Sequence, residues 1–122
     1  MISAVIVDDD FDTMVIFTEL LELIPVKIVG IGTNGKDAVE QYKKYQPDII
    51  FLDLAMPDYD GYYAIEKIKE ISKDAKIIVT TANIKENTTD RIKKLGVNTI
   101  LYKPFGLEQI EQVLTNELKI QS

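Results

Sequence analysis

The chain has 122 residues and a net charge of −6, and its hydrophobic (46%) and charged (28%) fractions are ordinary for one globular domain. Because it contains neither cysteine nor histidine, disulfides, thiolate or imidazole metal ligands, and catalysis by either side chain are excluded. The acidic charge disfavours general nucleic-acid binding, no apolar run approaches the roughly 20 residues that span a membrane, and the N-terminus lacks the layout of a signal peptide. We therefore expect a cytoplasmic protein that contacts neither nucleic acid nor membrane directly.

Apolar runs and helical patterns alternate along the chain. In chain order, the first half predicts a strand at 4–7, a helix at 11–23, a strand at 26–31, a helix at 36–45 and a strand at 49–52. The second half predicts a helix at 62–71, a strand at 76–81, a helix at 83–95, a strand at 99–102 and a helix at 107–118. The strand at 49–52 is an unbroken apolar run, which is typical of a strand buried on both faces.

This alternation predicts an α/β fold of the flavodoxin-like, doubly wound type, a (βα)5 sandwich with helices on both faces of a five-stranded parallel sheet. The strand order 2-1-3-4-5 is common in such sheets, and its ligand-binding crevice lies between the carboxyl ends of strands 1 and 3. No repeat, low-complexity tract or linker interrupts the pattern. We expect a single stand-alone domain over residues 1–122, with no output domain.

Two helix ends carry clear signals. Asp10 or Asp12 can cap the first helix, and Gly96 is a C-cap for the fourth. The apolar face of the fourth helix is thin and consists of Ile84, Ile92 and Leu95. A helix with so little to bury is held by few contacts, so we expect it to shift easily.

Carboxylates end two of the predicted strands. Asp8 and Asp9 follow the first strand, and Asp53 ends the third. The predicted topology brings these ends together at the crevice, where like charges raise one another's pKa or require a cation. A set of oxygen ligands without imidazole or thiolate suits Mg²⁺ or Mn²⁺. A single aspartate at such a position is often only a turn residue or a helix cap.

The fourth and fifth strands end in Thr81 and in Lys103, on the same edge of the sheet. A hydroxyl and an ammonium beside three carboxylates form a set that can bind a phosphoryl group, since phosphoryl transfer needs mainly positioning and charge neutralisation. A carboxylate such as that of Asp53 can act as the nucleophile and form an aspartyl-phosphate.

Taken in order, these motifs resemble the receiver domain of response regulators in two-component signalling, and the similarity covers nearly the whole chain. The matching pieces are Val7-Asp8-Asp9, Asp53 with Met56-Pro57 and Asp60-Gly61, Thr81-Ala82, and Lys103-Pro104-Phe105. The resemblance implies a signalling domain rather than an enzyme acting on a separate substrate. It also implies a cis peptide bond between Lys103 and Pro104.

The resemblance further implies that Asp53 accepts a phosphoryl group from the phosphohistidine of a sensor histidine kinase or a phosphotransfer protein. The reaction would depend on Mg²⁺, with Asp9, Asp53 and the backbone carbonyl of Ala55 as ligands and Asp8 holding waters of the ion. The expected output surface is the face formed by the fourth helix, fifth strand and fifth helix. The output partner is unknown, and either a monomer or a phosphorylation-dependent dimer is compatible with the sequence.

In the family, Thr81 and Lys103 would bind the phosphoryl group, and the Thr81 hydroxyl would then be drawn inward. An aromatic residue three positions before the lysine usually follows this movement. Ile100 occupies that position here, while Tyr102 directly precedes the lysine. The switch would therefore use packing of Ile100, or Tyr102 from a different direction.

Several alternatives stay open at this point. A small phosphatase of the haloacid-dehalogenase type also uses an aspartate nucleophile, but it needs a second acid where Ala55 stands. A receiver-like adaptor that works without phosphorylation is a second alternative. The run Gly30 to Gly35 matches G-x-G-x-x-G of dinucleotide sites but follows the wrong strand. Within the family, a chemotaxis-type regulator or a phosphorelay intermediate fits best.

Overall fold

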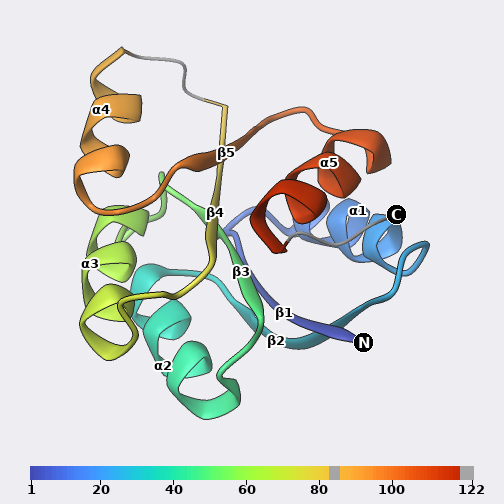
Figure 1. The fold of residues 1–122 in the computed structure, drawn as a ribbon, viewed down its shortest axis with the longest axis horizontal. Coiled ribbons are helices and arrows are strands. Elements are labelled where there is room, and N and C mark those ends of the chain that lie inside the picture. The colour runs from blue at the N-terminus through green and yellow to red at the C-terminus, as the bar shows by residue number, and fades with distance from the viewer. Residues whose placement is uncertain (83–85, 119–122) are drawn as a thin grey trace.

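The computed structural model describes residues 1–82 and 86–118. Its elements are, in chain order, β1 (Ile2–Val7), α1 (Phe11–Leu21), β2 (Val26–Gly32), α2 (Gly35–Tyr45), β3 (Ile49–Asp53), α3 (Gly61–Ile71), β4 (Ile77–Thr81), α4 (Glu86–Lys94), β5 (Thr99–Tyr102) and α5 (Leu107–Leu118). Figure 1 shows α1 and α5 on one side of the sheet and α2, α3 and α4 on the other. Within the described residues, no helix combines the length and apolar character that crossing a membrane requires.

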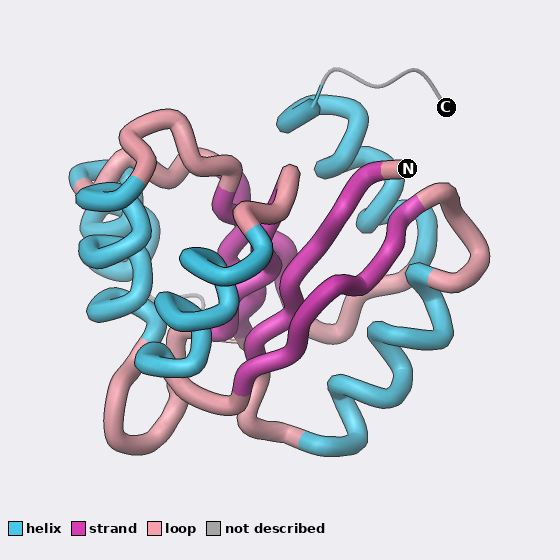
Figure 2. The backbone as a smooth tube through the Cα atoms, turned by 90° about the horizontal axis from the view of Figure 1, so that it is seen from below, coloured by secondary structure: helices cyan, strands magenta, loops and turns pink. Residues whose placement is uncertain are grey.

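The five strands form one parallel sheet in the order β2-β1-β3-β4-β5. The predicted topology is therefore confirmed. Figure 2 shows the strands as a central layer between the helices. The pairing of β1 with β2 shifts register once, because Ala4 pairs with Ile28 whereas Val5 pairs with Gly30, which leaves Val29 as an extra residue in the edge strand.

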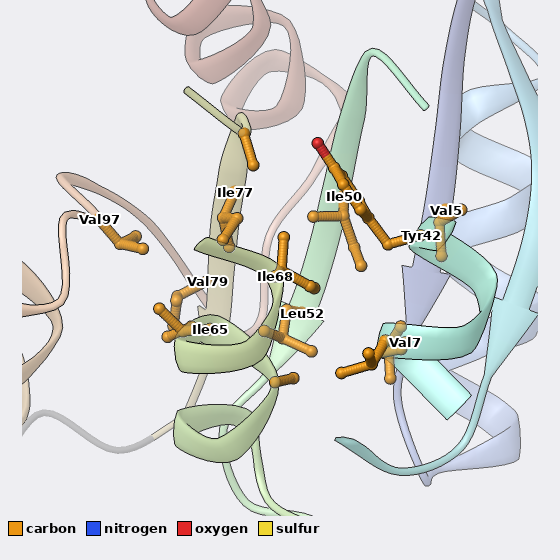
Figure 3. Packing of buried hydrophobic residues seen from close by; sticks show 14 of the residues in the cluster. Val5, Val7, Tyr42, Ile50, Leu52, Ile65, Ile68, Ile77, Val79 and Val97 are labelled. Carbon is orange, nitrogen blue, oxygen red and sulfur yellow. The ribbon is translucent and has the colours of Figure 1, made fainter. Parts of the chain in front are cut away.

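The central strands supply both halves of the core because successive side chains point to opposite faces. In β3, Ile50 and Leu52 pack with α2 and α3, whereas Ile49 and Phe51 pack with α1 and α5. Figure 3 shows the first of these clusters. Every residue of β3 is buried, Asp53 included. The prediction of a strand buried on both faces is therefore confirmed.

The first helix ends earlier than the sequence suggested. Asp10 is its N-cap and accepts a hydrogen bond from the backbone N–H of Thr13, which decides between the two candidate caps. The helix ends at Leu21 rather than residue 23, because Leu23 and Ile24 enter a tighter turn whose N–H groups bond to carbonyls three residues back. The predicted extension was wrong because the chain leaves the helical conformation before Pro25, and Leu23 is exposed in this turn.

The fourth helix ends at Lys94 and is capped as predicted by Gly96, whose φ is +90°. The N–H of Gly96 bonds to the carbonyl of Lys93, and the N–H of Val97 bonds to that of Ile92. These two bonds, with Val97 and Ile92 buried in the same cluster, form a Schellman-type end. The predicted start at 83, and Ile84 with it, lies outside the described residues.

Candidate functional site

Three carboxylates meet where β1 and β3 end. Asp8 follows β1 and Asp53 ends β3, and these strands are neighbours in the sheet. One oxygen from each of Asp8, Asp9 and Asp53 lies within 4.8 Å of the other two. Asp8 and Asp53 are buried, whereas Asp9 is exposed. The structure therefore brings together the acidic residues that the sequence placed at this edge.

Lys103 joins the acidic cluster from β5. Its Nζ lies 2.7 Å from an Asp8 oxygen and 3.7 Å from an Asp53 oxygen. The following peptide bond to Pro104 is cis, as the resemblance implied. The Lys103 backbone N–H donates to the carbonyl of Thr81 over 2.9 Å, which fixes the lysine against the end of β4. One ammonium among three carboxylates leaves an excess of negative charge when all of them are ionised.

The pKa of the Asp53 carboxyl is raised to about 6, chiefly by burial and in smaller part by the nearby carboxylates of Asp8 and Asp9. The Lys103 ammonium and the backbone N–H of Ala55 act in the opposite direction. A divalent cation would compensate the excess negative charge of this pocket. The donors are oxygen atoms only, which fits Mg²⁺.

The loop after β3 is held tightly against the acidic residue. The Gly61 N–H donates to the carbonyl of Leu54 over 2.9 Å. A Cβ at Gly61 would lie 2.5 Å from the backbone oxygen of Asp53 and 2.7 Å from the Cα of Leu54, so only glycine fits. Asp60 caps α3 by accepting from the N–H of Tyr63. These contacts explain why an Asp-Gly pair belongs in the motif that follows Asp53.

A cavity of about 480 Å³ lies beside the acidic cluster. Its lining includes Ala55 and Thr81, both of which the sequence analysis had assigned to the site. Tyr62 of α3 and Thr88 of α4 also line it, and neither was among the predicted site residues. Tyr62 opens a helical pattern and Thr88 lies in a polar helix, so neither carried a local signal. The placement of α4 across the sheet edge decides their role.

The two candidate switch residues of β5 have different environments. Ile100 is partly buried and packs against the same core cluster as Tyr62, Tyr63 and Leu95. Tyr102 is 43% exposed. The structure therefore places Ile100 near the α3–α4 side of the site, and leaves much of the Tyr102 ring in solvent.

The glycine-rich run Gly30 to Gly35 has a packing role. Gly35 begins α2, and its N–H donates to the carbonyl of Tyr59. A Cβ at Gly35 would collide with the backbone oxygens of Tyr59 and Asp60. The run lies at the end of the edge strand β2, where the carbonyl of Gly32 accepts a hydrogen bond from the backbone N–H of Asp8. The third glycine thus lets α2 approach the loop after β3.

The described geometry defines the class of this chain. A family model described as the response regulator receiver domain matches residues 4–115. The chain belongs to this family of two-component signalling domains.

Its relatives include chemotaxis proteins named CheY. The CheY of Halobacterium salinarum is 35% identical over 117 residues, which cover 93% of this chain and 97% of that protein. The CheY of Thermotoga maritima is 32% identical over 114 residues, with 93% and 95% covered. A chain in the crystal structure of the CheX–CheY–BeF3–Mg²⁺ complex from Borrelia burgdorferi superposes with a TM-score of 0.91 at 27% identity, covering 98% of this chain and 90% of that one.

Proposed function

We propose that this chain is a receiver that stores a phosphoryl group on Asp53 and signals by protein–protein contacts. The observation that carries the proposal is the convergence of Asp8, Asp9, Asp53 and Lys103 at the ends of three strands. Three of the four groups are acidic and one is basic. Such a set can attract a cation and a phosphoryl group together.

The proposed transfer is a substitution at phosphorus. An oxygen of the Asp53 carboxylate forms a bond to phosphorus, while the bond from phosphorus to the donor's imidazole nitrogen breaks and that nitrogen keeps the electron pair. Lys103, 3.7 Å from the Asp53 oxygen, pairs with the charge of the phosphoryl oxygens. Thr81, on the neighbouring strand end, donates its hydroxyl to another of these oxygens.

Mg²⁺ completes the proposed site. Asp9 and Asp53 would hold it with their carboxylates, Ala55 would contribute its backbone carbonyl, and Asp8 would hold its waters. When bound, the ion neutralises charge that develops on the phosphoryl oxygens. Asp8 also positions Lys103 through their ion pair at 2.7 Å.

The proposed donor is a sensor histidine kinase or a phosphotransfer protein. The absence of histidine from the chain fits an acceptor that relies on a separate phosphohistidine. A cytoplasmic location belongs to the same proposal, because donor and acceptor must meet in one compartment. The chemotaxis CheY relatives support a chemotaxis-type role, and a phosphorelay intermediate is the second form of the same function.

Acetyl phosphate with Mg²⁺ tests the phosphoacceptor. We expect the intact mass of the protein to rise by one phosphoryl group, and hydroxylamine to release this group as inorganic phosphate and leave an aspartyl hydroxamate. Asp53→Asn should abolish this uptake because the amide is not a nucleophile for the transfer. The matched control is Asp58→Asn, an exposed residue of the same loop with a φ of +70°, which asparagine tolerates.

Equal uptake by the Asp53→Asn protein would contradict the assignment. Steady release of inorganic phosphate from simple phosphate esters would instead support the phosphatase alternative. A protein that takes up no phosphoryl group and shows no spectral response to beryllofluoride would be the phosphorylation-independent adaptor.

A further inference from the structure

The helix α4 is attached to the body of the protein by few side chains. Of its residues with described burial, Thr88 and Ile92 are buried, whereas Arg91, Lys93 and Lys94 are exposed. A specific contact supplements these two residues. The Arg91 guanidinium carbon lies 3.7 Å from the centre of the Tyr62 ring, which is close enough for a cation–π interaction. Tyr62 of α3 therefore supports α4.

Tyr62 borders two cavities, and Asp60 borders both of them as well. Tyr62 lines the cavity of about 480 Å³ beside the acidic cluster, together with Thr81 and Thr88. It also lines a second cavity of about 360 Å³ between α3 and α4, together with Arg91 and Lys94. If a group in the first cavity changed the position of the Tyr62 ring, the contact between Tyr62 and Arg91 of α4 would therefore change as well.

The neighbouring side chains are less suited to this task. Ile100 packs in the same cluster, but its β-branched side chain has restricted rotation about χ1. Tyr102 is 43% exposed and lines neither cavity. The large ring of Tyr62 can fill space at the edge of the first cavity and carry a cation on its face.

We propose that Tyr62 is a positioning residue that couples the state of the acidic site to the position of α4. A phosphoryl group on Asp53 would occupy space beside Thr81, and the cavity wall formed by Thr81, Thr88 and Tyr62 adjusts to it. The ring then moves under Arg91, and α4 follows. This inference rests on the proposed function and names the route by which that site is read at the surface. The coupling requires that the contacts of the Tyr62 ring differ between the protein with and the protein without a phosphoryl group on Asp53.

A fluorine label on α4 tests the route. The chain has no cysteine, so Lys93→Cys provides a unique attachment point on an exposed position of α4. We expect beryllofluoride with Mg²⁺ to shift the fluorine resonance in this parent protein. Tyr62→Leu should abolish the fluorine shift. Tyr62→Phe should retain it because the ring remains, and Arg91→Gln should reduce it. The mass gain with acetyl phosphate should persist in all three variants.

Tyr63→Leu is the matched control. Tyr63 is the next residue of α3, and its ring lies 4.9 Å from that of Tyr59 and lines only the second of the two cavities. We expect the fluorine shift to be unchanged in this variant. An equal loss in Tyr63→Leu would overturn the inference, because general loosening of α3 would then explain the result.

Two further outcomes separate this inference from the proposed function. A full fluorine shift in Tyr62→Leu, or a parent protein that takes up the phosphoryl group without any shift, would overturn the coupling and leave the phosphoacceptor intact. A parent protein that takes up no phosphoryl group and shows no shift would overturn both.

Discussion

The strand β3 and the helix α4 have opposite environments. All five residues of β3 are buried, and their side chains pack on both faces of the sheet. The nine-residue α4 is largely polar, with Thr88 and Ile92 as its buried residues among those with described burial. The nucleophile that we propose thus lies on the most tightly enclosed strand, while the helix that would report its state is loosely held. Site geometry benefits from rigid elements, and movement requires weakly held ones.

The largest expected effect is on the rigid side of this comparison. Phe51 is fully buried, and its ring packs edge-on against Phe17 with centroids 4.8 Å apart. Phe51→Ala should lower the free energy of unfolding by about 3–5 kcal/mol, as measured by urea denaturation. Lys93→Ala on α4 should change it by no more than about 0.5 kcal/mol. Similar losses in the two variants would remove the contrast between β3 and α4.

The second effect concerns pH. The pKa of Asp53 is raised by burial from 3.8 to about 6, so the folded protein holds this proton more tightly than the unfolded chain. Without divalent cations, protonated Asp53 contributes at most about 3 kcal/mol to the free energy of unfolding. This contribution is complete below pH 3.8 and is lost as the pH rises through 6. Since the chain has no histidine, no imidazole titration overlaps this window.

Urea titrations in EDTA at several pH values measure this dependence. Asp53→Asn should flatten the curve between pH 4 and 7 and should be more stable than the parent protein at pH 7.5. Added Mg²⁺ should stabilise the parent protein more than the variant, because the ion favours the ionised carboxylate. A variant less stable than its parent at pH 7.5 would contradict the burial argument.

The smallest effect probes the attachment of α4. Gly96 has a φ of +90°, and a Cβ there would meet only the flexible end of Lys69, at 3.5 Å or more. Gly96→Ala should therefore cost about 1 kcal/mol through backbone strain rather than through a clash. Amide hydrogen exchange should accelerate in α4 and leave β3 unchanged. Equal acceleration in both elements would show that α4 is not an independent unit.

The sequence predicted the alternation of elements because each strand is a short apolar run and each break carries a turn or capping residue. It predicted the meeting of Asp8, Asp9, Asp53 and Lys103 because parallel strands end at one edge. Both inferences need only the strand order. The order is itself constrained by the right-handed crossovers of βαβ units.

Other features could not be inferred because they depend on how elements sit against one another. Leu23 continues the apolar pattern of α1, yet the chain must leave the helical conformation before Pro25, and the last turn tightens instead. Tyr62 and Thr88 become cavity residues only through the placement of α4 on α3. Such placements follow from packing in three dimensions, which local patterns do not encode.

The extra residue Val29 in β2 has a consequence for self-association. On either side of it, β1 and β2 keep a regular register for three residue pairs only. Because β2 is an edge strand, its outer backbone groups could otherwise template pairing with a second chain. A bulge bends the strand and increases its twist, so a second copy would meet an interrupted edge. The irregularity thus makes edge-to-edge pairing through β2 less favourable.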